Sequence, residues 1–76
     1  MTKTFLLLQL DSEGAPYSEV ADLLENMGFR PEIRGYDFVY DWGRGVTVPE
    51  SLELANRIHT ALHGKRLGFR IETTDE

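Results

Sequence analysis

The stretch PYSEVADLLENMGF (residues 16–29) predicts a helix with a defined beginning and end. Its apolar side chains recur at every third or fourth position, which is the spacing of one buried helix face. They are Tyr17, Val20, Ala21, Leu24 and Met27. Pro16 suits the first helical turn, and Gly28 suits the left-handed residue that ends a helix. Phe29 should then fold back onto Leu24.

The segment before this helix, TKTFLLLQL (residues 2–10), predicts a β-strand. It has the length of a strand, and its apolar residues lack helical spacing. Phe5 and Leu7 point to one face and three leucines point to the other. Apolar side chains on both faces are typical of a strand in the middle of a sheet.

The segment after the helix, residues 30–48, predicts a β-hairpin with two alternative turns. Pro31 and the charged residues beside it suit an edge strand. The sequence YDFVYDW (residues 36–42) alternates and places four aromatic residues on one face. One turn would lie at Arg34-Gly35. The other would lie at residues 43–45 and pair the aromatic strand with residues 46–48, and its two glycines favour it.

Residues 49–62 predict a second helix, and residues 68–73 predict a last strand. Thr47 and Glu50 have the spacing of a capping box, and Gly64 suits the end of the helix. The expected buried stripe consists of Leu52, Ala55, Ile58 and Leu62. We expect residues 74–76 to form a frayed acidic tail.

The predicted order of elements is β-α-β-β-α-β, which is the ferredoxin-like arrangement. This fold class is α+β, with a four-stranded antiparallel sheet and two helices on one face. The chain of 76 residues then forms a single domain, residues 1–76. The second face of the sheet should remain open, and an apolar patch there is typical of an interface.

The composition limits the classes of function. The chain has no cysteine, which excludes a disulfide scaffold, a thiolate zinc site and a cysteine nucleophile. The net charge of −5 opposes binding to nucleic-acid backbones. No apolar run approaches the roughly 20 residues of a membrane span, and no signal-peptide pattern is present. We therefore expect a cytoplasmic protein that has no membrane partner and no cofactor.

The aromatic row and its neighbours are the main candidate site. The expected binding surface consists of Arg34, Tyr36, Phe38, Tyr40 and Trp42. The same row could instead be core beneath the helices or a dimer seam, and these alternatives stay open. Lys65, Arg66 and Arg70 lie close together in the sequence and could form a small basic rim.

The sequence RGYDFVY (residues 34–40) resembles the RNP1 motif of RNA-recognition motif (RRM) domains. Residues 62–65, followed by Leu67 and Ile71, are similar to the second-helix end and last strand of that family. The resemblance implies that Tyr36 and Phe38 stack on bases and that Arg34 contacts phosphate. The chain departs from the motif at Asp37.

A second resemblance covers residues 4–40. A strand that ends in Leu10-Asp11, followed by VADLLE (residues 20–25) and MGF (residues 27–29), is similar to VapD toxins and to the small CRISPR spacer-acquisition nucleases. That resemblance implies a ferredoxin-like dimer in which Asp11 is a metal ligand and catalytic residue. Two symmetry-related carboxylates would hold Mg²⁺ and activate water.

His59 and His63 form a further metal-ligating pair, because residues four apart share one helix face. No third ligand is identifiable in the sequence, and two surface histidines are the simpler interpretation.

These observations favour a small non-enzymatic binding or regulatory module over an enzyme. We expect it to associate with itself as a homodimer, or with another protein, through the open sheet face. The alternatives are RRM-like binding of single-stranded RNA and a metal-dependent, VapD-like endoribonuclease.

Overall fold

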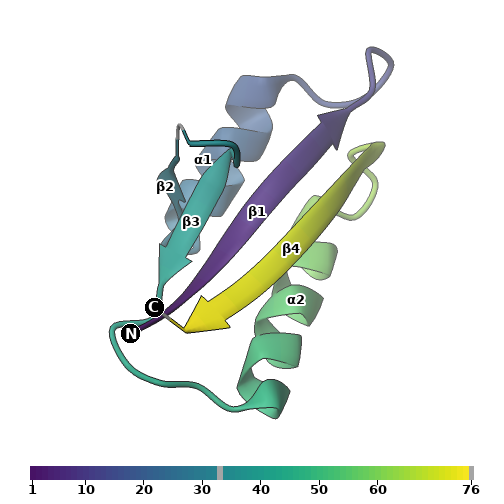
Figure 1. Cartoon of the computed structure of the whole chain (residues 1–76). Coiled ribbons are helices and arrows are strands. Elements are labelled where there is room, and N and C mark those ends of the chain that lie inside the picture. The colour runs from purple at the N-terminus through teal and green to yellow at the C-terminus, as the bar shows by residue number, and fades with distance from the viewer. Residues whose placement is uncertain (33, 76) are drawn as a thin grey trace.

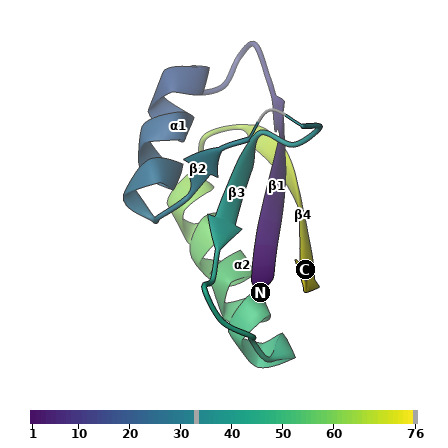
Figure 2. The same cartoon turned by 60° about the vertical axis from the view of Figure 1, so that its left-hand side comes forward.

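The computed structural model describes residues 1–32 and 34–75 and shows two helices packed on one face of a four-stranded sheet (Figure 1). The elements are β1 (Thr2–Leu10), α1 (Tyr17–Asn26), β2 (Arg30–Pro31), β3 (Phe38–Asp41), α2 (Val48–Leu62) and β4 (Leu67–Asp75). The strands lie in the order β2-β3-β1-β4, and each neighbouring pair is antiparallel. Figure 2 shows both helices on the same side of the sheet. This is the ferredoxin-like βαββαβ arrangement, and it confirms the predicted fold class.

Strand β1 lies in the middle of the sheet, as its apolar residues on both faces predict. It pairs with β4 along its whole length and with β3 over residues 3–6. Thr2, Thr4 and Leu6 are buried against the helices, so the alternate residues face away from them. Leu6 is the central apolar contact of this strand with the core.

The first helix ends as its sequence predicts. Gly28 has a φ of 104°, which glycine adopts without steric cost. The amide of Phe29 donates to the Leu24 carbonyl at 3.0 Å, and the Gly28 amide donates to the Glu25 carbonyl at 3.0 Å. These two bonds form a Schellman ending, and they bring Phe29 into the core.

The second helix begins at the predicted capping box, in which Thr47 and Glu50 accept each other's backbone amides. Its buried face confirms Ile58 and Leu62 of the predicted stripe and adds Leu54, which the prediction lacked. Leu52, which was expected in the core, is 60% exposed. Leu52 and Leu54 belong to two different apolar stripes of the helix sequence. The capping box and the strands beneath the helix orient it so that the stripe with Leu54 faces the sheet.

The favoured hairpin turn was wrong. Residues 46–48 do not pair with the aromatic strand; instead β2 pairs with β3, with Arg30 opposite Val39. After β3 the chain continues beside β1, where Trp42 N donates to the Thr2 carbonyl and Thr2 N donates to the Arg44 carbonyl. These bonds prevent the chain from turning back at residues 43–45, and it proceeds directly into α2.

The C-terminal strand is longer than expected. Thr74 and Asp75 pair with Lys3 and Thr2, so these two residues are not frayed. Residue 76 of the predicted tail lies outside the described residues. No helix in the described part of the chain is long and apolar enough to cross a membrane.

Candidate functional site

The face of the sheet that the helices leave uncovered carries a mixture of apolar and charged side chains. β1 contributes Lys3, Phe5 and Leu7, because the alternate positions on this strand face the helices. The registers with β3 and β4 place further residues on this face. These are Val39, Asp41, Arg70, Glu72 and Thr74.

An aromatic pair stands at the centre of this face. The rings of Phe5 and Tyr36 are tilted by 35° with their centroids 5.1 Å apart, which is a favourable contact distance for two rings. The Tyr36 hydroxyl donates to Glu72 Oε2 at 2.8 Å. This hydrogen bond is the main reason why the pKa of Tyr36 is raised above its usual value. Tyr36 therefore reaches from the loop before β3 across β1 to β4.

A hollow of about 330 Å³ lies beside this pair. Its walls combine both rings with charged side chains of both signs, so the hollow suits a ligand that has an apolar centre and polar edges. Its lining consists of Lys3, Phe5, Glu32, Arg34, Tyr36, Glu72 and Thr74.

The structure divides the aromatic row that the sequence placed on one face. Phe38 is 1% exposed and lies in the core, opposite Leu6 on the helix-covered side. Tyr40 also packs against this core, with its ring centroid 5.3 Å from that of Phe29. Of the alternatives for this row, the core beneath the helices therefore holds for Phe38, Tyr40 and Trp42, and only Tyr36 lies on the uncovered face.

Asp37 explains why Tyr36 and Phe38 face opposite sides although two positions separate them. Its amide donates to the Leu6 carbonyl at 2.9 Å, and its carboxylate oxygen Oδ2 accepts the Leu8 amide at 2.7 Å. The side chain of Asp37 thus takes a place in the β1–β3 ladder that a backbone carbonyl would normally occupy. The alternation is interrupted at this residue, and Tyr36 turns to the uncovered face.

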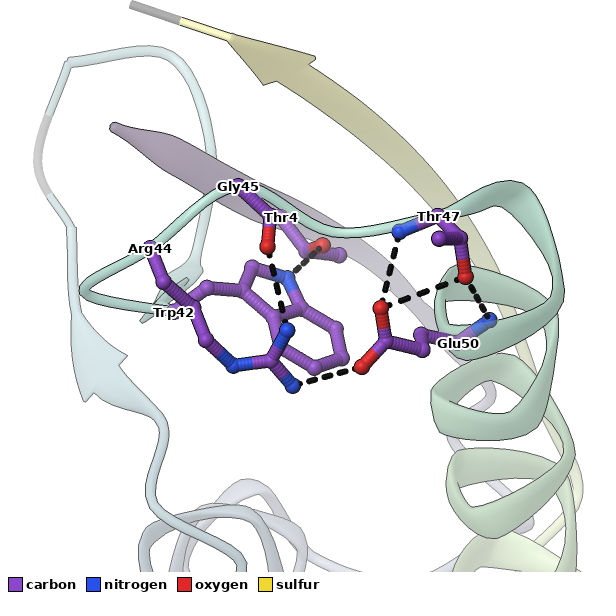
Figure 3. Close-up of polar contacts among 6 residues, drawn as sticks. All are labelled: Thr4, Trp42, Arg44, Gly45, Thr47 and Glu50. Atoms are coloured by element: carbon purple, nitrogen blue, oxygen red, sulfur yellow. Dashed lines mark hydrogen bonds and ion pairs between the residues drawn. The ribbon is translucent and has the colours of Figure 1, made fainter.

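Trp42 belongs to a polar network that joins the sheet to α2, and Figure 3 shows its first bond, from the indole to Thr4. Its Nε1 donates to Thr4 Oγ1 at 2.9 Å, and Thr4 Oγ1 lies 2.8 Å from Thr73 Oγ1. Thr73 Oγ1 in turn lies 3.0 Å from Ser51 Oγ on α2. These hydroxyl groups were not predicted, although threonine at positions 2, 4 and 73, on the helix-covered face of two strands, is a signal that could have indicated them.

Arg44 stabilises the connection between β3 and α2. Its guanidinium lies 5.6 Å from the centroid of the Trp42 ring and forms an ion pair with Glu50 at 2.6 Å (Figure 3). The hydrogen bond from Arg44 is the largest cause that lowers the Glu50 pKa to about 2, and the capping contacts with Thr47 add to it. Arg44 therefore anchors the N-terminal end of the helix.

The structure places two residues of the predicted basic rim together and the third, Arg70, elsewhere. Lys65 Nζ lies 2.6 Å from a carboxylate oxygen of Glu19, and Arg66 lies 3.9 Å from Asp11. Both are in the turn before β4, whereas Arg70 lies on the uncovered face. The rim is thus not one basic patch.

The predicted metal ligands lie in two separate segments, the turn after β1 and the C-terminal end of α2. Asp11 forms a turn after β1: its Oδ1 accepts the Glu13 amide at 2.9 Å, and its carbonyl accepts the Gly14 amide at 2.9 Å. His59 is exposed on α2 and His63 is exposed at its C-cap, with ring centroids 6.0 Å apart. Within residues 1–32 and 34–75, no three acidic or imidazole side chains form a group that could hold a metal ion.

No protein-family model, no curated protein and no solved structure matches this chain.

Proposed function

We propose that this chain is a non-enzymatic binding module that uses the uncovered face of the sheet to bind a partner protein. The observation that carries this proposal is the Phe5–Tyr36 ring pair beside the hollow on this face. Aromatic residues next to a concave surface are frequent anchors of protein interfaces. A helix-free sheet face leaves such an anchor accessible.

The chemistry of the hollow indicates what the partner presents. Lys3 and Arg34 provide positive charge, and Glu32 and Glu72 provide negative charge. A segment of protein with one aliphatic or aromatic side chain, flanked by charged residues of both signs, would complement this surface. The charges at the rim would select the orientation of the segment more than they would increase its affinity.

Single-stranded RNA is a second candidate ligand, because four of the eight basic residues gather on or beside this face. They are Lys3, Arg30, Arg34 and Arg70. Base stacking on an exposed ring typically contributes about 1–3 kcal/mol per base. The bases would stack on Phe5 and Tyr36 and not on Tyr36 and Phe38, the pair that the RRM resemblance implies, because Phe38 lies in the core.

Selection of peptides from a random phage-displayed library tests the proposal. Peptides that bind the wild-type protein should lose at least tenfold in affinity for Tyr36→Ala and retain it for Tyr17→Ala. Tyr17 is the matched control, because it is an exposed tyrosine on α1, away from the uncovered face. Equal binding to both variants would contradict the proposed site.

Fluorescence anisotropy of a labelled oligouridine tests the RNA candidate. Binding should weaken steeply as salt increases and should be lost in Tyr36→Ala. Trp42 is not a suitable reporter, because its indole is bonded to Thr4 on the opposite side of the sheet. No change in anisotropy at low salt would remove RNA from the candidates.

A further inference from the structure

The two edges of the sheet differ in their capacity to accept another strand. The edge at β2 has two residues, and one of them is Pro31, which lacks an amide hydrogen. The edge at β4 has nine residues (Figure 1). Among the described residues, no backbone group outside β1 forms a hydrogen bond with the backbone of β4. A long strand edge of this kind is a template for pairing with another chain.

We infer that the outer edge of β4 pairs in antiparallel orientation with β4 of a second copy of this chain. The two-fold axis would pass through Ile71, the middle residue of the strand. This register aligns all nine residues and keeps the helices of both copies on the same side. The two sheets would then form one continuous sheet.

The charges of β4 select this register. With the axis at Ile71, Arg70 of each copy lies opposite Glu72 of the other, on the uncovered face. An axis at Arg70 would place the two arginines opposite each other, and an axis at Glu72 would do the same with the two glutamates. Opposite charges on directly paired residues stabilise a sheet, and like charges destabilise it.

Two exposed apolar residues lie beside the same edge. Val48 and Leu52 are 72% and 60% exposed, one turn apart at the start of α2. Together with Thr73 and Asp75 near the end of β4, they line a hollow of about 380 Å³. Pairing at β4 would bring the helix layer of the second copy next to Val48 and Leu52. These two apolar side chains, exposed in the single chain, would then be covered in the dimer.

The asymmetry of the edges also limits the size of the assembly. Pairing through β4 uses the long edge of both copies, and the β2 edges that remain are short and blocked by proline. An interface with this two-fold symmetry is closed. The expected product is a dimer and not a growing fibre.

Sedimentation equilibrium of four forms of the chain tests this inference. The wild type should sediment as a dimer of 8.7 kDa chains. Arg70→Glu places carboxylates opposite each other twice, so its dissociation constant should rise by at least roughly tenfold. The double variant Arg70→Glu, Glu72→Arg restores both opposite-charge pairs and should recover the dimer.

A mixture provides the sharpest comparison. Arg70→Glu has acids at both positions 70 and 72, and Glu72→Arg has bases at both. The self-association of each variant alone should therefore be weakened. When the two variants are mixed, they should form a one-to-one heterodimer. Circular dichroism verifies that every variant is folded. A wild-type monomer at millimolar concentration, or an unchanged dimer in Arg70→Glu, overturns the inference. Neither result depends on ligand binding by the uncovered face, because no ligand is present.

Discussion

The indole nitrogen of Trp42 donates a hydrogen bond of 2.9 Å to the hydroxyl of Thr4, a residue that is 1% exposed (Figure 3). This bond holds the residue after β3 against β1 on the side of the helices. Through Thr73 and Ser51 the same hydroxyl network reaches β4 and α2. Four segments that are far apart in the sequence are thereby joined at one point.

Replacement of the central hydroxyl should destabilise the protein. Thr4→Val has nearly the same shape, but it removes the acceptor of the indole and the partner of Thr73. The loss of partners for buried polar groups costs about 1–3 kcal/mol. Urea unfolding followed by circular dichroism should show this decrease in the free energy of unfolding.

Thr74→Val is the matched control. The Thr74 hydroxyl is buried without a hydrogen-bond partner among the described residues. Because the substitution removes a hydroxyl that gains nothing in the folded state, the free energy of unfolding should stay within about 0.5 kcal/mol or increase. An equal loss in both variants would show that the network contributes no specific stability.

The division of the aromatic row predicts different sensitivities for two neighbouring aromatic residues. Phe38→Leu removes ring atoms from a fully buried position and should cost about 1–2 kcal/mol. Tyr36→Leu removes a half-buried surface ring and should cost less than about 1 kcal/mol. The urea midpoints of both variants measure the difference, and the reverse order would place Tyr36 in the core.

The helices could be predicted from the sequence because their signals are local. The Gly28-Phe29 ending and the Thr47–Glu50 cap are each set by residues within a few positions of one another. The fold class, with both helices on one face of the sheet, followed from the succession of elements, since right-handed connections leave few alternatives. These features require no knowledge of distant parts of the chain.

The errors came from contacts between distant residues. The glycines at 43 and 45 favour a turn, but the hydrogen bonds of Trp42 and Arg44 with Thr2 extend the chain beside β1. The position of Tyr36 depends on the bond of Asp37 to an amide 29 positions away. A pattern of alternating residues contains no information on either partner, so the candidate surface could be predicted only as a face and not as a set of side chains.

The Arg44–Glu50 ion pair predicts a dependence of stability on pH. The pKa of Glu50 is about 2 in the folded protein, against its ordinary value of 4.5. Between these two values the unfolded chain binds the proton and the folded protein does not, so stability decreases as the pH falls through this range. The melting temperature of the wild type should therefore decrease in part because of Glu50 as the pH falls from about 4.5 to about 2.

Glu50→Gln isolates this contribution. The variant should be less stable than the wild type at neutral pH, and most of the difference should be lost by about pH 2, where half of the folded wild-type carboxylates are protonated. Glu53→Gln, an exposed residue of the same helix, is the control. A constant difference across the range would mean that the charge of Glu50 is not responsible.

The carboxylate of Asp37 should control both the stability of the β1–β3 pair and the position of Tyr36. Asp37→Ala leaves the half-buried Leu8 amide without its acceptor, at a cost of about 1–3 kcal/mol. Hydrogen exchange measured by NMR should show faster exchange at Leu8 in this variant. Asp37→Asn keeps an oxygen acceptor, so its exchange rate at the Leu8 amide should lie between those of Asp37→Ala and the wild type.

The variants of Asp37 also connect this bond to the proposed binding surface. Without the carboxylate, the residues before β3 can resume strict alternation, which would move Tyr36 away from Phe5 and Glu72. Asp41→Ala is the control, because that carboxylate is exposed and, within the described part of the chain, accepts only the local amide of Gly43. The nuclear Overhauser contacts between the rings of Phe5 and Tyr36 should weaken in Asp37→Ala and persist in Asp41→Ala. Contacts that persist in both variants would show that the hydrogen bond between Tyr36 and Glu72 alone holds the ring in place.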